Sequence, residues 1–201
     1  MLRTRSSLLR RLKDSSDEES WKEFVTLYEP LLLAYARRRG LAEEDASDVT
    51  QEVLASLFRS LPGFELTRDR GRFRTWLWRV VQNSIADWGR RQARRHRAEK
   101  GWRERIRPPT GDAEREHEAE WNAAYRKRVL ELALQRVRKK TSPVKWTCFE
   151  RHKLEGQAGA TVARELGISV ELVYVNASRV LARVRDTCAE YGDDFCAGDG
   201  V

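Results

Sequence analysis

The sequence predicts an all-α protein of two small helical domains joined by a flexible linker, with a helix-turn-helix in the C-terminal domain. Apolar residues recur every three or four positions over long stretches, and no segment alternates apolar and polar residues as a half-buried strand does. The apolar content falls sharply between His96 and Glu116, which indicates a linker. The expected divisions are an N-terminal domain over 1–95, a linker over 96–116, a C-terminal domain over 117–191 and a tail over 192–201.

The first helix is expected to start near Ser16, where Glu19 stands at the spacing of a capping box. Pro30 is expected to kink or break it, because proline cannot donate the backbone hydrogen bond of a helix interior. Gly40 is a suitable residue to end it.

Two more helices are expected in the N-terminal domain. The second has apolar residues at helical spacing between Ala46 and Phe58 and ends at Leu61-Pro62-Gly63. A polar connection over 65–72 follows, and the third helix runs from about Phe73 to Arg94.

The C-terminal domain is expected to contain four helices. The first covers the periodic stretch 121–137, and Thr141-Ser142-Pro143 breaks it. The others are expected over 146–154, 161–166 and 170–191.

The positive charge of the chain is concentrated in one segment. The 201 residues carry a formal net charge of +8, from 39 basic and 31 acidic side chains. Between Arg90 and Arg107, nine basic residues occur with only two glutamates, so most of the net charge lies there. A basic block on an otherwise balanced chain indicates contact with a polyanion.

The bulk composition excludes several classes of protein. With 40% hydrophobic residues the chain can bury a core, so it is not disordered as a whole. No apolar run is long enough for a membrane span or a signal peptide, which predicts a cytoplasmic protein. The three cysteines, Cys148, Cys188 and Cys196, form no CxxC pair and are expected to be reduced thiols.

The strongest local motif lies between Ala160 and Tyr174. A short helix is followed by the turn Gly167-Ile168-Ser169, and a longer helix opens after the serine, which is the layout of a helix-turn-helix. The exposed face of the second helix is expected to carry side chains that can hydrogen-bond bases and phosphates, namely Glu171, Tyr174, Asn176, Ser178, Arg179 and Arg183. In a basic, all-helical chain this favours DNA binding over an ordinary helical hairpin.

The helix from Phe73 carries a second motif. Seven residues fall within one arc and are predicted to face the core: Phe73, Trp76, Leu77, Val80, Val81, Ser84 and Trp88. Trp78 lies at the margin of that arc, and the opposite side carries Arg79, Gln82, Asn83 and Arg90. An aromatic ring beside arginines suits single-stranded DNA, but a core residue at the rim beside a solvated basic face fits the pattern equally well.

A third motif is acidic. Glu43, Glu44, Asp45, Asp48 and Glu52 occur within ten residues, and the last three lie near one helical stripe. Such carboxylates can form a protein-binding surface, a solvated face or part of a divalent-metal site. Metal sites gather ligands from several elements, and no further acidic pair or histidine completes one here.

Together these motifs resemble bacterial RNA polymerase sigma factors. The segment 45–54 looks like the helix that binds the polymerase core, and 71–83, continued by 87–91, looks like the promoter-melting segment. The helix-turn-helix is similar to the promoter-reading domain, and two helical domains with a short linker are typical of the extracytoplasmic-function (ECF) group. The resemblance covers about residues 5–190.

The resemblance implies three sets of site residues. Core polymerase would be bound by Asp45, Asp48, Gln51, Glu52 and Leu54. The minus-ten element would be bound and opened by Arg72, Arg74, Trp76, Trp78, Arg79, Asn83, Arg90, Arg91 and Arg94, and the 65–72 loop would hold a flipped base. The minus-thirty-five element would be read by Glu171, Tyr174, Asn176, Ser178, Arg179 and Arg183.

Core RNA polymerase and promoter DNA are the partners that the resemblance implies, and it leaves open whether an anti-sigma factor binds as well. A sigma factor is a non-enzymatic initiation subunit, so neither a cofactor nor a metal is expected. The stretch Tyr174-Val175-Asn176 departs from the Lys-Ser-Arg of many relatives, which leaves the promoter preference open.

The residues alone are also compatible with two other classes of protein. One is a stand-alone helix-turn-helix regulator whose N-terminal domain dimerises or senses a ligand. The other is a metal-dependent nuclease or recombinase that uses the acidic cluster. The sequence contains no nucleophile elbow and no Gly-rich phosphate loop, and His96, His117 and His152 have no ligand spacing to a cysteine.

Overall fold

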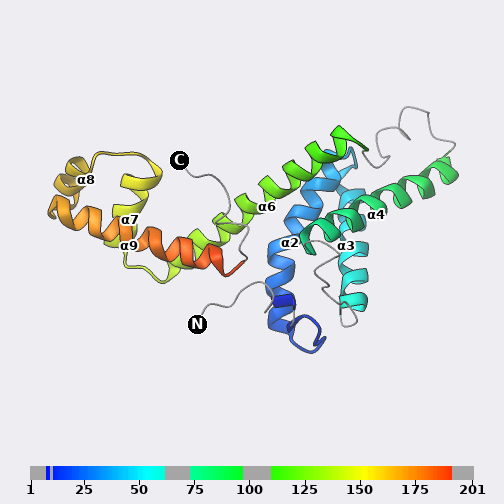
Figure 1. The fold of residues 1–201 in the computed structure, drawn as a ribbon, viewed down its shortest axis with the longest axis horizontal. Helices are drawn as coiled ribbons and strands as arrows, with labels where there is room; N and C mark the ends of the chain where they lie inside the picture. The colour runs from blue at the N-terminus through cyan, green and yellow to red at the C-terminus, as the bar shows by residue number, and fades with distance from the viewer. Residues whose placement is uncertain (1–7, 10, 62–72, 97–109, 192–201) are drawn as a thin grey trace. The chain divides into compact units, whose positions relative to one another are not determined.

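The computed structural model describes residues 8–9, 11–61, 73–96 and 110–191, and side chains of the third range as far as Gln92. These residues form helices and connecting turns, with no strand among them (Figure 1), so the predicted all-α fold is confirmed. None of the helices within these ranges is long and apolar enough to cross a membrane.

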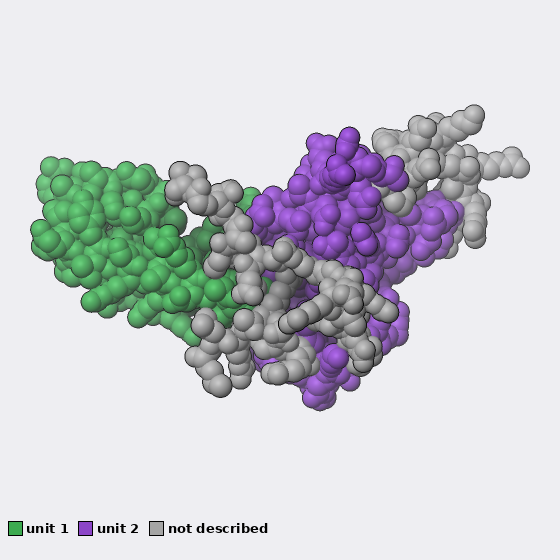
Figure 2. Space-filling model, in the orientation of Figure 1, with its two compact units in different colours: residues 1–6, 127–201 green, residues 7–126 purple. Residues whose placement is uncertain are grey.

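The chain divides into two compact units, shown in different colours in Figure 2. The N-terminal unit comprises residues 7–126, and the C-terminal unit comprises residues 127–201 together with residues 1–6. The boundary near residue 126 lies inside a helix, α6 (Asp112–Lys139), which contributes to both units.

Helix α2 (Glu18–Arg38) opens the N-terminal unit. Its cap is Asp17, whose carboxylate accepts a hydrogen bond from the Ser20 backbone N–H, so the expected capping box at Ser16 is wrong. The Arg11 guanidinium, together with that N–H and the Ser20 hydroxyl, lowers the pKa of Asp17 to about 2. The helix continues through Pro30, and Gly40 follows it in a left-handed conformation, φ +89°, that favours glycine.

Helices α3 (Glu43–Ser60) and α4 (Phe73–His96) pack with α2 to form the core of the N-terminal unit. The core contains fully or nearly fully buried side chains from each helix: Phe24, Tyr28 and Leu32 of α2, Val49, Val53 and Leu57 of α3, and Leu77, Trp78 and Val81 of α4. Phe73 makes edge-on ring contacts with Phe24 and Tyr28, which joins the start of α4 to α2.

The first half of α6 completes this core, which the sequence did not predict. Trp121 is completely buried, donates from its indole nitrogen to the Arg74 backbone carbonyl at 3.3 Å, and packs edge-on against Tyr35. One turn further on, Tyr125 is buried and stacks on Tyr28.

Of the linker expected over 96–116, residues 97–109 lie outside the described part of the chain, and residues 112–116 are helical. The C-terminal unit begins near residue 127, about ten residues later than the domain start expected at 117. The difference arises because the aromatic residues of 117–126 bury their rings against α2 and α4.

The C-terminal unit contains the second half of α6, then α7 (Pro143–Phe149), the π-helical turn η3 (Glu150–Leu154), α8 (Gly159–Leu166) and α9 (Val170–Ala189). Helices α7 and α8 both pack against α9. A buried cluster holds α7, α8 and α9 together and consists of Cys148, Val162, Ala163 and Val173, with Leu166, Ile168 and Val170 partly buried around it. Cys148 and Cys188 are both buried free thiols, while Cys196 lies outside the described residues.

Replacing Trp121 with alanine should destabilise the N-terminal unit, because it removes a completely buried ring and leaves a cavity between α2 and α4. We expect the free energy of unfolding, measured by urea titration with circular dichroism, to fall by about 3–5 kcal/mol. Leu130→Ala on the same helix is the control, since Leu130 is exposed and should cost less than about 1 kcal/mol. Equal losses in the free energy of unfolding would contradict the packing of the first half of α6 against α2 and α4.

Candidate functional site

Helix α3 presents a polar face to solvent. Asp48, Gln51 and Glu52 are exposed, and Asp45 and Leu54 are partly buried beside them. The opposite side of the helix is buried against the core through Val49, Val53 and Leu57. The predicted polymerase-binding residues therefore share an accessible surface. Within the described residues, no three His, Cys, Asp or Glu side chains gather closely enough to hold a metal ion.

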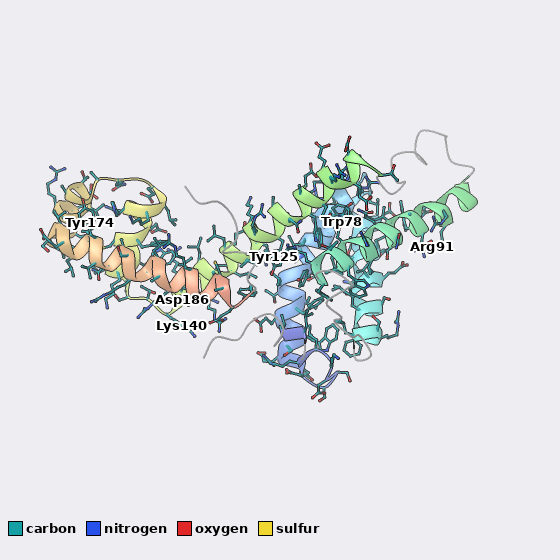
Figure 3. The ribbon with its side chains drawn as sticks, in the orientation of Figure 1. Trp78, Arg91, Tyr125, Lys140, Tyr174 and Asp186 are labelled. Carbon is teal, nitrogen blue, oxygen red and sulfur yellow. The ribbon has the colours of Figure 1, made fainter. Side chains whose placement is uncertain are left out.

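One member of this surface pairs with helix α4. The Arg91 guanidinium donates to the Glu52 carboxylate at 2.7 Å, and both side chains are about half exposed. Arg90 pairs with Asp87 one turn earlier on its own helix. An exposed ion pair of this kind contributes little to stability, about 0–1 kcal/mol. The contact nevertheless joins the acidic face of α3 to the basic end of α4, where Figure 3 labels Arg91.

The buried stripe of α4 differs from the predicted arc. The buried positions come in neighbouring pairs, Phe73 and Arg74, Leu77 and Trp78, Val81 and Gln82, Ile85 and Ala86, and Trp88 and Gly89. The predicted core residues Trp76, Val80 and Ser84 are only partly buried. The predicted arc was wrong because it was centred on apolar side chains, whereas this core also contains the side chains of Arg74 and Gln82.

Trp78 is a core residue, and the expectation that it lies at the margin is wrong. Its side chain is completely buried, close to the phenol of Tyr35. Burial raises the pKa of Tyr35, while the charge of Arg39 acts in the opposite direction. The ring is therefore not available to stack on a DNA base in this conformation.

Arg74 is the second residue that was predicted to contact DNA and is buried in the structure. Only 4% of the residue is exposed. Its Nε donates to the Asn122 side-chain oxygen at 2.5 Å, and its guanidinium lies 4.9 Å from the centre of the Tyr125 ring. The next residue, Thr75, donates from its hydroxyl to Glu118 at 3.0 Å. These partners all belong to α6, so the sequence of α4 alone could not have indicated the burial.

The other predicted minus-ten residues fall into three groups. Arg79, Asn83, Arg90 and Arg91 are exposed along α4. Trp76 is partly buried, and its ring contacts Phe73. Arg72, the side chain of Arg94 and the 65–72 loop lie outside the described residues.

The predicted helix-turn-helix is formed by α8, a three-residue turn and α9. Gly167 ends α8 in a left-handed conformation, φ 64° and ψ 35°, and Ile168 N–H then bonds back to the Ala163 carbonyl. Ser169 is the N-cap of α9 and accepts from the Leu172 backbone N–H. The two caps therefore fix the turn at the positions expected from the sequence.

The outer surface of α9 carries five of its six predicted DNA-reading residues. Glu171, Tyr174, Ser178, Arg179 and Arg183 are exposed. Hydrogen bonds from its own backbone N–H and from the Ser169 hydroxyl lower the pKa of Glu171, so its carboxyl group stays charged.

Asn176 is not part of this surface. It is 4% exposed and points its amide toward the Cys148 sulfur at 3.9 Å, so its assignment as a DNA contact is corrected. Sequence reasoning also missed two exposed apolar residues, Leu172 and Val175. The position of Val175 on the helix, about 140° from Val180, could have indicated it, but a search limited to polar side chains passed over both residues.

Comparison with known proteins identifies the N-terminal unit. The family model for sigma-70 region 2 matches residues 24–95, from the first turns of α2 to the end of α4. The N-terminal unit is thus similar to sigma-70 region 2 over these residues. The chain is also similar to the ECF RNA polymerase sigma factor SigE of Mycolicibacterium smegmatis, with 32% identity over 81 residues. That alignment covers 40% of this chain and 30% of the relative, so the chain spans less than a third of its length.

The residues that match the region 2 model, 24–95, include both the exposed α3 face and the basic end of α4. Both belong to one compact unit and are joined by the pair between Glu52 and Arg91. The two matches confirm the sequence-based resemblance to ECF sigma factors for the part of the chain that they cover, which for the family model is residues 24–95.

Alanine substitutions of Trp76 and Trp78 should lower stability by different amounts, because Trp78 is completely buried and Trp76 is only partly buried. Trp78→Ala should lower the free energy of unfolding by about 3–5 kcal/mol, because its side chain is completely buried. Trp76→Ala should cost less than half as much, because that ring is partly exposed. Urea titration of both variants measures the difference, and equal losses would contradict the orientation of α4.

Proposed function

We propose that the chain is an ECF-type sigma factor, a non-enzymatic subunit that binds core RNA polymerase and directs promoter recognition and opening. The single observation that carries the proposal is the sigma-70 region 2 match over residues 24–95. The name of the similar mycobacterial protein, an ECF RNA polymerase sigma factor, supports the same class.

The proposed polymerase contact is the exposed face of α3. Asp48, Gln51 and Glu52 project from it, with Asp45 and Leu54 at its edge. The two carboxylates suit a basic protein surface.

The proposed minus-ten surface lies on α4. Arg79, Asn83, Arg90 and Arg91 are exposed and can contact phosphates or unpaired bases. Arg72 and Arg94, which the resemblance assigns to this surface, remain part of the proposal. Trp78 and Arg74 are withdrawn from it, because both are buried.

The proposed minus-thirty-five reader is α9. In a helix-turn-helix, the second helix enters the major groove and its N-terminal residues meet base edges. Glu171, Tyr174, Ser178, Arg179 and Arg183 are exposed on α9. Their hydroxyl, carboxylate and guanidinium groups are the types that contact bases and phosphates.

Co-purification with core polymerase, followed by run-off transcription, tests the proposal against its alternatives. A sigma factor binds core polymerase and confers initiation at a defined promoter. A stand-alone regulator would bind DNA tightly without polymerase, and a nuclease would cut DNA in the presence of magnesium. Either of the last two results, with no binding to polymerase, would overturn the proposal.

Reversing two charges on α3 should abolish polymerase binding. In the double variant Asp48→Arg with Glu52→Arg, co-purification with core polymerase should be lost while the circular dichroism spectrum stays unchanged, because both residues are exposed. The matched control is Glu116→Arg with Glu120→Arg, two exposed glutamates at the same spacing on α6. If the α3 variant still co-purifies, α3 is not the docking helix.

Arg179→Ala should weaken binding to the upstream promoter element by about 1–3 kcal/mol, since a bidentate base contact would be lost. The measurement compares holoenzyme affinity for the selected promoter and for a random duplex of equal length. An equal loss on both would assign Arg179 to a phosphate instead of a base.

A further inference from the structure

The outer face of α9 is partly apolar. Opposite its buried stripe, Val173, Ala177, Val180 and Val184, stand four exposed residues at helical spacing, Glu171, Val175, Ser178 and Ala182. Leu172, Tyr174 and Val175 are exposed by 44%, 47% and 42%, so three large apolar side chains reach solvent within four positions. At about 100° per residue, Val175 lies on the outer face, with Leu172 and Tyr174 on its two flanks.

The Tyr174 ring is held against the rest of the helix-turn-helix. A Cβ atom added to Gly159 would lie 2.6 Å from Cε1 of Tyr174 and 2.8 Å from its hydroxyl oxygen, so the ring lies directly over this glycine at the start of α8. On another side it meets His152, with ring centres 5.0 Å apart. The His152 Nδ1 is in turn 2.9 Å from the Gln157 carbonyl oxygen. Figure 3 labels Tyr174 at this position.

These contacts fix an exposed aromatic ring before any ligand binds. Because Gly159 has no side chain, the ring can lie close to the backbone of α8, and His152 limits its movement sideways. A ring that is fixed in advance loses less conformational entropy on binding than a free one.

We propose that Val175 and Tyr174 read thymine methyl groups in the upstream promoter element, with Gly159 and His152 as positioning residues for the Tyr174 ring. The proposal rests on the proposed function and specifies the ligand chemistry of its α9 surface. In the major groove, the C5-methyl of thymine is the apolar feature of the base edges, and apolar side chains are suited to contact it.

Charges around the patch favour DNA over a protein as the occupant. Arg179 and Arg183 are exposed on α9, and Arg164 is exposed on α8. Exposed guanidinium groups near Val175 suit the phosphates that border the base edges of a groove. Glu171 lies at the N-terminal end of the strip, where a charged carboxylate can accept a hydrogen bond from a cytosine amino group.

The test removes the methyl groups from the DNA. The upstream element is first defined by selecting promoter fragments that the holoenzyme, formed with the full chain, binds from a random library. Each thymine of that element is then replaced by deoxyuridine, which lacks only the methyl group. We expect one or two positions to lose about fourfold in affinity, which is the free energy of burying one methylene group converted to a ratio.

Two variants should remove this sensitivity while leaving the fold intact. Val175→Ala should make one position indifferent to deoxyuridine. Gly159→Ala should do so at a second position, because its new Cβ would overlap the outer atoms of the Tyr174 ring and force the ring to move. If Gly159 acts through the Tyr174 ring, adding Tyr174→Ala to Gly159→Ala should cause no further loss of affinity for the upstream element. Val144→Ala is the control, since Val144 is similarly exposed, by 49%, on α7.

The outcomes are separable. The thymine proposal is overturned if deoxyuridine has no effect on affinity at any position. It is also overturned if Val144→Ala changes the sensitivity to deoxyuridine as much as Val175→Ala does. If Val175→Ala weakens association with polymerase when no DNA is present, the patch binds protein instead. If the holoenzyme selects no upstream element at all, the failure lies with the proposed function of α9 and not with its ligand chemistry.

Discussion

The burial of Trp121 between α2 and α4 is the interaction on which the N-terminal unit depends. Its indole N–H donates to the Arg74 carbonyl, while the Arg74 side chain donates from Nε to Asn122 and lies over the Tyr125 ring. A buried donor or cation that loses its partner costs far more than the bond contributes, so these groups must remain together. The first half of α6 is therefore a structural part of the N-terminal unit, although it follows residues 97–109 in the chain.

The sequence predicted the helices well because their apolar spacing is a local property. The apolar spacing predicted the third helix correctly. It placed Trp78 at the margin of the buried face and Gln82 on the exposed face, because local spacing cannot show that polar side chains are also buried. Arg74 was assigned to DNA for the same reason. Its partners lie nearly fifty residues away on α6, and no periodicity within α4 contains that information.

The helix-turn-helix, which we propose to read DNA, shows the complementary error. The turn was predicted correctly, because Gly167 and Ser169 are the residues that a left-handed cap and an N-cap require. The surface of α9 was predicted from residue type, which favoured the polar Asn176 and passed over Val175. In the structure Asn176 is buried and Val175 is exposed, since position around the helix decides which side chain reaches solvent.

The pair between Glu52 and Arg91 has a consequence for genetic studies of this protein. Glu52 belongs to the face assigned to polymerase and Arg91 to the face assigned to DNA, yet the two side chains share one contact. A substitution at either position alters the surroundings of the other, so a single-site phenotype does not distinguish one surface from the other. Epistasis between the two positions is the informative quantity: exchanging the two residues restores the contact but moves each charge onto the opposite face.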